Sequence, residues 1–240
     1  MSHILHEKID KYFFVGLFAV VIIIIFNQVQ ISAIASSYDS AGSGGKSFLS
    51  FGGKKIDVKD VDVSQIQSTQ MAVALLFPEL KSMKSEDDAI GIMIASGTPE
   101  YSEKLGGITF DDPVTSLEYL AKWYYSLKED VKKSNPDVWK RYLSLATQPR
   151  GISCEYCCGV GPKGINANGD LLCGCSHNPA IQALTMGLMM ETDYNDAEVL
   201  REAMKWKALW FPKDMVQAAL TVAGKDASEL KQLPGMVGGC

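Results

Sequence analysis

Residues 112–147, DPVTSLEYLAKWYYSLKEDVKKSNPDVWKRYLSLAT, contain two helix starts of the same kind. Asp112-Pro113 and Asn135-Pro136 each place a side-chain acceptor at the N-cap and a proline at the first helical position. After each start, apolar residues recur at the three- and four-residue spacing of a buried helix face. The pattern predicts helices over about 113–132 and 136–147. The expected core residues of these helices are Leu117, Leu120, Tyr124, Leu127, Val138, Tyr142 and Leu145.

The same kinds of signal extend over the rest of the chain. A capping-box pattern at residues 85–88 precedes an apolar segment, and Asn178-Pro179 predicts a helix over about 179–191. Further helices are expected from Asn195 or Asp196 to about Leu209 and from Pro212 to Ala223. Alternation of apolar and charged residues in 54–63 predicts one short edge strand. The predicted fold is therefore mainly α, a bundle-like helical domain with an inserted cysteine-rich loop.

The inserted loop, residues 154–177, reads CEYCCGVGPKGINANGDLLCGCSH and holds five of the six cysteines and one of the three histidines. The spacing is C-x2-C-C-x14-C-x-C-x-H, and the x14 segment is rich in glycine and asparagine, which favour tight turns. A reversal there would bring the two cysteine groups together. Gln148–Gly151 marks the boundary expected between a helical region, 54–150, and a region of loop and C-terminal helices, 151–240.

Three chemistries fit this cysteine pattern. Thiolates bind zinc or copper, and four ligands would complete a tetrahedral site. An oxidising compartment would instead favour disulfides, and a CxxC or CxC pair can also exchange thiol and disulfide. The metal hypothesis takes Cys154, Cys157, Cys173 and Cys175 as ligands, with Cys158 as a possible replacement, His177 in or beside the ligand set, and Cys240 as a mobile additional ligand.

Methionines 186, 189 and 190 follow the loop at helical spacing. Thioether sulfur suits Cu(I), but methionine more often fills gaps in a core. The core interpretation is the preferred one.

The N-terminal part predicts a membrane anchor. Residues 13–26 are apolar, and the segment 13–35 has no charged residue, which is long enough for a transmembrane helix. Cleavage of a signal peptide after Ala35 is the alternative. Lysines precede the segment and none follows until Lys46, so residues 1–12 are expected in the cytoplasm. A Ser/Gly-rich linker, 36–53, then leads to a domain outside the cytoplasm.

The net charge and the motifs of the sequence argue against several classes of function. The chain has 23 basic and 28 acidic residues and a net charge of −5, which argues against nucleic-acid binding. It contains no P-loop, HExxH or Ser-His-Asp pattern. A metal-binding protein is therefore expected rather than an enzyme, with zinc or copper as the ion. The alternatives are a thiol–disulfide oxidoreductase and a disulfide-stapled structural or interaction domain. Apart from the membrane, no partner is implied.

The segment from Cys154 to His177, with the following helices and the C-terminal Gly-Gly-Cys, resembles a family of uncharacterised archaeal proteins. These have one N-terminal membrane helix and a CxxCCG…CGCxH segment, and the resemblance implies a membrane anchor but no particular activity. A weaker similarity, through Cys157-Cys158-Gly159 and Cys173-Gly174-Cys175, is to bacterial PCYCGC-motif lipoproteins. The prolyl start of that motif is missing here, and no functional role follows from it.

Overall fold

The structure is a computed structural model that describes residues 56–227, Leu230 and residues 233–239. The predicted membrane anchor at 13–35, the linker at 36–53 and Cys240 lie outside the described residues. Within the described residues, no helix has both the length and the apolar character required to cross a membrane.

The described part of the chain is mainly helical, as predicted, with eight α-helices and no strand. The α-helices are α2 (Thr69–Leu76), α3 (Glu86–Met93), α4 (Pro113–Ser134), α5 (Pro136–Ala146), α6 (Glu155–Cys158), α7 (His177–Glu191), α8 (Asp196–Trp210) and α9 (Pro212–Val222). Three short 3-10 helices are η1 (Val63–Gln65), η2 (Pro78–Ser82) and η3 (Glu103–Leu105).

The edge strand predicted for residues 54–63 does not form in the described part of that segment. Two aspartates bend the chain there. Asp57 accepts a hydrogen bond from the Lys59 N–H at 2.9 Å, and Asp62 accepts one from the Ser64 N–H at 2.9 Å. These local side-chain bonds favour turns over an extended chain, so the strand prediction is wrong.

Most predicted helix starts are confirmed at the level of individual hydrogen bonds. Asp112 caps α4 by accepting from the Thr115 N–H at 3.1 Å. Residues 85–88 and 195–198 each form a capping box, at the starts of α3 and α8. Asn135 also precedes a helix, α5, but makes no side-chain capping bond, so Pro136 alone carries the start signal there.

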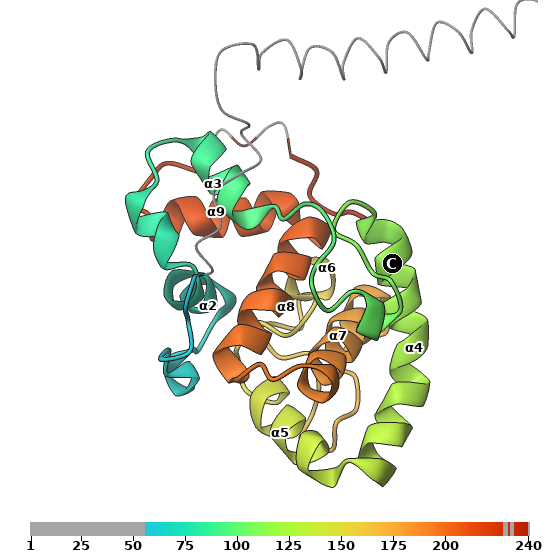
Figure 1. The fold of residues 1–240 in the computed structure, drawn as a ribbon. Coiled ribbons are helices and arrows are strands. Elements are labelled where there is room, and N and C mark those ends of the chain that lie inside the picture. Colours follow the sequence, from blue (N-terminus) through green and yellow to red (C-terminus); the bar gives the residue numbers. More distant parts are fainter. Residues whose placement is uncertain (1–55, 228–229, 231–232, 240) are drawn as a thin grey trace, which may run out of the picture. The chain divides into compact units, whose positions relative to one another are not determined.

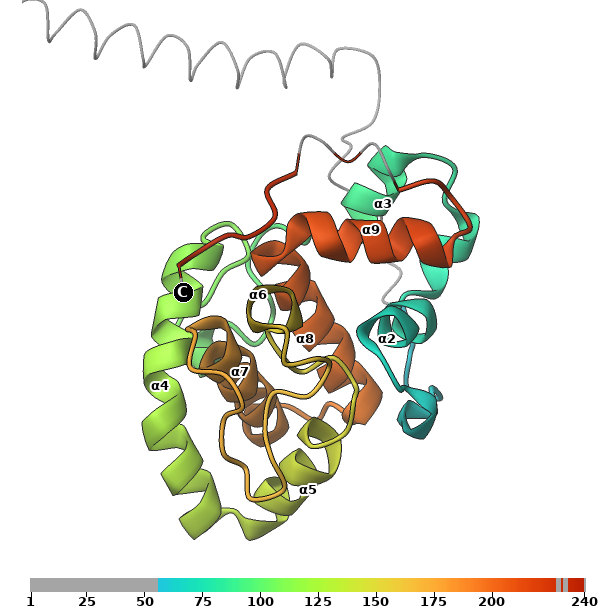
Figure 2. The ribbon, with the colours of Figure 1, turned by 180° about the vertical axis from the view of Figure 1, so that it is seen from behind.

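Helix α7 forms the centre of the fold, with α4, α5 and α8 packed around it (Figures 1 and 2). Residues 177–189 are all buried, as expected for a helix that is surrounded by protein. Met186 and Met189 are among them, which confirms their assignment to the core. On another side, α9 packs against α2, α3 and α8. The described residues from Asp57 onward form one compact unit, in which 148–151 is a turn.

One predicted start is wrong in detail. Helix α7 begins at His177, two residues before the predicted position, and Asn178 lies inside its first turn. The Asn178 side chain does not cap the helix. Instead its Nδ2 donates to the Gly164 carbonyl at 2.8 Å and to the Cys173 carbonyl at 3.1 Å. The residue that sequence reasoning assigned to capping therefore holds the preceding loop in place.

Candidate metal centre

The cysteine loop, residues 151–176, folds back so that its two ends approach each other. Its backbone makes isolated bridges rather than a sheet, and a turn at residues 166–170 closes it. There the Asn166 side chain accepts the N–H groups of Asn168 and Asp170, both at 2.9 Å. The prediction that asparagine and glycine reverse the chain between the two cysteine groups is confirmed. The bridges pair Ile152 with Lys163 and Ile165 with Leu171.

Buried polar side chains of the helical core fix the loop from within. Gln182 of α7 donates to the Ile152 carbonyl at 3.0 Å and accepts from the Tyr142 hydroxyl at 2.8 Å. Gly164 lies so close that an added Cβ would stand 2.3 Å from polar atoms of both Asn178 and Gln182. These directional bonds specify one conformation for a segment that has few apolar side chains of its own.

A buried lysine holds the short helix α6, which carries Cys157 and Cys158. The Lys207 ammonium donates to the Glu155 carboxylate at 2.5 Å, to the Gly151 carbonyl at 2.9 Å and to the Thr69 hydroxyl at 3.0 Å. The Thr69 hydroxyl also bonds to Glu155. Burial lowers the pKa of Lys207, and the adjacent Glu155 carboxylate opposes that shift. The first turn of α6 is thus tied to α2 and α8.

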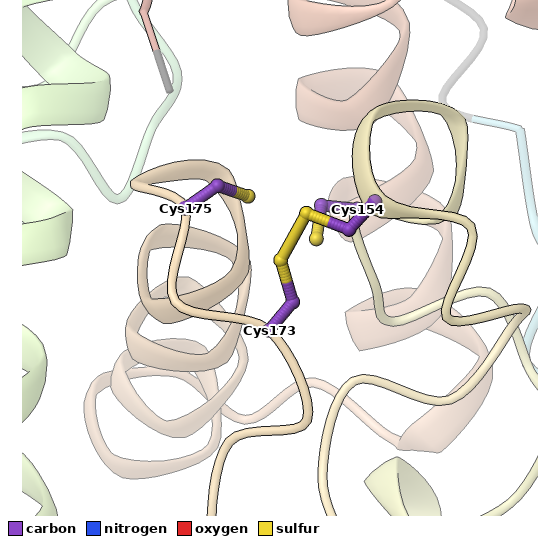
Figure 3. Close-up of side chains that lie close together, drawn as sticks. Cys154, Cys173 and Cys175 are labelled. Carbon is purple, nitrogen blue, oxygen red and sulfur yellow. A yellow bond between two sulfur atoms is a disulfide. The ribbon is translucent and has the colours of Figure 1, made fainter.

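Four cysteine sulfurs lie close together in the part of the loop that these hydrogen bonds hold in place. The Sγ atoms of Cys154, Cys158, Cys173 and Cys175 all lie within 4.8 Å of one another. Cys158 and Cys173 form a disulfide, whereas Cys154 and Cys175 are free and buried. Figure 3 shows the side chains of Cys154, Cys173 and Cys175 directed toward one common point from the two ends of the loop. We call these four residues the sulfur quartet.

The two free thiols of the quartet differ in acidity. The pKa of Cys175 is lowered to about 4, first by a hydrogen bond from the Cys154 thiol and also by the N–H groups at the start of α7. The same hydrogen bond, together with burial, raises the pKa of Cys154. Cys175 is therefore the more acidic thiol of the pair, and the thiolate is the form that binds metal.

His177 lies at the first position of α7, beside the quartet. Its Nε2 is 2.9 Å from the Val237 carbonyl, and its ring contacts the rings of Trp210 and Phe211. A carbonyl only accepts hydrogen bonds, so Nε2 is the donor in this contact. The Nδ1 atom of the same ring is buried and has no hydrogen-bond partner among the described residues.

The structure brings together all the predicted ligands that it describes, in a grouping different from the expected one. Cys158 completes the quartet in place of Cys157. Cys157, Cys175 and His177 form a second group, whose ligand atoms also lie within 4.8 Å of one another. Cys157 is disulfide-bonded in this structure. Cys240 lies outside the described residues.

The supporting residues Lys207, Glu155 and Thr69 did not emerge from the sequence. Their contacts span 52, 86 and 138 positions of the chain, which local patterns do not reveal. The position of Lys207 in the sequence does indicate one of these contacts. Lys207 follows Ala203 by four residues and precedes Trp210 by three, so it falls on the apolar stripe of α8. A lysine in that position indicates a buried partner.

No family model, curated protein or solved structure matches this chain. Its function must therefore be argued from the chemistry of the site.

Proposed function

We propose that this protein binds a thiophilic metal ion, Zn2+ or Cu+, through the sulfur quartet in its reduced form. The observation that supports this most directly is the separation of at most 4.8 Å among the four sulfurs. Zinc bonded tetrahedrally to four sulfurs at its usual bond length holds them about 3.8 Å apart. Adjustments of the cysteine side chains are enough to reach that arrangement, without refolding the loop.

Rigid support of the quartet favours a metal site over a flexible thiol cluster. The N-terminal end of the loop is held by Lys207 through Glu155 and by Gln182 at the Ile152 carbonyl. The C-terminal end is held by Asn178, which donates to the Gly164 and Cys173 carbonyls. A binding site gains affinity when its ligands are already positioned, because less conformational entropy is lost on binding. Free Cys175 already favours the thiolate form that the ion requires.

Reduction is a condition for this function, because two of the four ligands are joined in the Cys158–Cys173 disulfide. A dithiol reductant would deliver two electrons and two protons to the sulfur–sulfur bond and would itself become a disulfide. The thiols then lose their protons as the ion binds. The anchor predicted at 13–35 would place this metal-binding domain at the membrane, outside the cytoplasm.

Cobalt absorption tests the proposal, because Co2+ replaces Zn2+ and reports sulfur ligands by charge-transfer bands. The full-length protein in detergent is reduced with a phosphine under argon and titrated with Co2+. We expect intense sulfur-to-cobalt absorption that Zn2+ abolishes. Cys173→Ser should lose the four-sulfur spectrum, whereas Cys157→Ser, which leaves the quartet complete, should keep it. Reduced protein that binds no Co2+ contradicts the proposal.

A second candidate function, thiol–disulfide exchange, is favoured by one observation: the Cys175 sulfur lies within 4.8 Å of both sulfurs of the Cys158–Cys173 disulfide. The Cys175 thiolate would attack the Cys173 sulfur, forming a Cys173–Cys175 bond and releasing Cys158 as a thiolate. Cys158, the exposed member of the quartet, would then attack an external disulfide, forming a mixed disulfide and releasing one substrate thiolate. The free Cys154 thiol, within 4.8 Å of Cys158, would attack the Cys158 sulfur and release the second substrate thiol. The resulting Cys154–Cys158 disulfide would be reduced by an external dithiol before the next turnover. Catalytic reduction of a disulfide substrate, lost in Cys175→Ser, would establish this function.

A further inference from the structure

We infer that the reduced protein holds a second thiophilic ion beside the first, bound by Cys157, Cys175 and Nδ1 of His177, with the Cys175 sulfur bridging the two ions. This inference rests on the proposed function and extends it. Its starting point is that the two groups of possible ligands share one residue. Each group has its ligand atoms within 4.8 Å of one another, and Cys175 belongs to both.

His177 provides the strongest argument for the second ion. Its Nε2–H donates to the Val237 carbonyl, so Nδ1 is the nitrogen whose lone pair an ion can bind. The same arrangement, a histidine bonded to a carbonyl through one nitrogen and to a metal through the other, is common in metal sites. Nδ1 is buried without a hydrogen-bond partner in the described part of the chain, and a buried acceptor without a donor is costly. A metal ion beside Cys175 would occupy that lone pair.

Neighbouring side chains and the C-terminal backbone hold the His177 ring in one orientation. It lies 4.8 Å from the Phe211 ring and 6.2 Å from the Trp210 ring, measured between centroids. The Val237 carbonyl is itself positioned, because the Val237 N–H donates to the Trp210 carbonyl at 2.8 Å. The C-terminal segment therefore orients the histidine through its backbone.

Cys175 is placed to act as the bridge. Thiolate sulfur has several lone pairs and bonds two soft ions at once without losing its protein attachment. The quartet would give the first ion four sulfurs and a closed coordination shell. The second ion would have two sulfurs and one nitrogen, a three-ligand set that suits Cu+ and that leaves a fourth position open for zinc. We therefore expect the second ion to exchange faster than the first.

Both sites need the reduced protein, since Cys157 is disulfide-bonded in this structure and Cys158 is bonded to Cys173. The same dithiol reductant that opens the first site supplies two electrons and two protons for each further disulfide. Full occupancy by two ions therefore reports complete reduction of the cysteines involved.

The test counts Cu+ ions per chain. Full-length protein in detergent, reduced with a phosphine under argon, receives Cu+ from a competing chelator, and native mass spectrometry with elemental analysis gives the stoichiometry. We expect two ions for the unaltered protein and one for Cys157→Ser. His177→Gln should also bind one ion. This variant is the most specific test, because the glutamine amide can still donate to the Val237 carbonyl but offers no nitrogen ligand at the Nδ1 position.

Cys154→Ser combined with Cys158→Ser is the matched control. It leaves only two sulfurs at the first site and keeps every ligand of the second, so it should also bind one ion. X-ray absorption of the unaltered two-ion form should show a copper–nitrogen contribution and a copper–copper distance, both absent in His177→Gln. If His177→Gln fails to fold, the X-ray absorption spectrum of the unaltered protein is the test. A spectrum with sulfur neighbours of copper and no nitrogen neighbour overturns the inference. One ion on the unaltered protein, or two on His177→Gln, overturns it as well. Absence of any copper would instead contradict the proposed function.

Discussion

The helical core around α7 and the cysteine loop are held by different forces. In the core, Leu184, Trp206 and their neighbours are almost completely buried, and removal of apolar surface from water supplies most of the stability. The loop has few such side chains. It is fixed by hydrogen bonds from Gln182, Asn178 and Lys207, and by the Cys158–Cys173 disulfide.

This difference explains how one unit can combine a stable helical framework with a group of cysteines held in fixed positions. Burial is non-directional and tolerates exchange of one apolar side chain for another of similar size. Hydrogen bonds and sulfur ligands need exact positions, so they specify the geometry of the loop while adding less to its stability. We therefore expect changes in the core to unfold the whole unit, and changes at the loop to act locally.

Trp206→Ala should have the largest effect. The Trp206 side chain is fully buried, packs against Phe110 and Trp210, and bonds to the Tyr101 hydroxyl. Its removal should lower the free energy of unfolding by about 3–5 kcal/mol. Urea unfolding followed by circular dichroism measures this effect. Reaction of the buried thiols with a chromogenic disulfide should follow the same transition.

Tyr125→Ala is the control for this change, because Tyr125 is 62% exposed and its loss should matter by less than about 0.5 kcal/mol. The thiols could instead become reactive at a lower urea concentration than that at which the helices unfold. In that case the loop would be a separate unfolding unit, and the core would not control it.

Lys207→Met should have the next largest effect. Methionine keeps most of the buried aliphatic chain but leaves Glu155 without its ammonium partner, at an expected cost of about 3 kcal/mol. Because Glu155 lies in α6, the thiols of Cys154 and Cys175 should also become reactive in the folded protein. Thermal unfolding and the rate of thiol modification measure the two effects.

Lys122→Met is the matched control for this lysine. Lys122 pairs with Glu118 on the surface of α4, where both side chains are more than half exposed, and such a pair contributes little. We expect a change of less than about 0.5 kcal/mol and no change in thiol reactivity. Equal effects at the two lysines would mean that the buried network does not hold the loop.

The same distinction explains what could be predicted from the sequence. Helix starts such as Asp112-Pro113 depend on contacts within four residues, so the sequence alone predicts them correctly. Clustering of the cysteines was also predictable, because glycine and asparagine between them favour a reversal. Which cysteine joins the quartet was not, since α6 turns Cys158 rather than Cys157 toward Cys173. Asn178 was misassigned because capping and loop bracing use the same side chain, and only the tertiary fold selects between them.

Removal of the disulfide should have a smaller effect than either buried substitution. In the metal-free oxidised protein, Cys158→Ala with Cys173→Ala opens a loop of 15 residues, which lowers stability by at most about 3 kcal/mol through unfolded-chain entropy. Helix content should not change, because the core does not depend on the bond. Thermal unfolding with circular dichroism of the folded baseline checks both statements. Loss of helical signal in the folded state would show that the loop also organises the core.

The smallest effect should come from Asp88, whose carboxylate accepts the N–H groups of Lys84 and Ser85 at 2.7 and 3.0 Å at the exposed start of α3. These hydrogen bonds lower the pKa of Asp88 below its usual 3.8. A carboxyl group with a depressed folded-state pKa stabilises the protein fully above the unfolded value, and this contribution is lost as the pH falls through the folded value.

Asp88→Asn should therefore be less stable than the unaltered protein at neutral pH, and the difference should vanish in acid, below pH 3.8. Urea midpoints of both proteins at several pH values measure this difference, which salt should reduce because the site is exposed. Asp87→Asn, which removes the same charge from the first turn without touching the capping box, separates the hydrogen bonds from the helix dipole. If Asp88→Asn lowers the free energy of unfolding by less than Lys207→Met does, the exposed hydrogen bonds of this cap are weaker than the buried ones that hold the cysteine loop. A pH-independent difference would show instead that the charge of Asp88 makes no contribution to the cap.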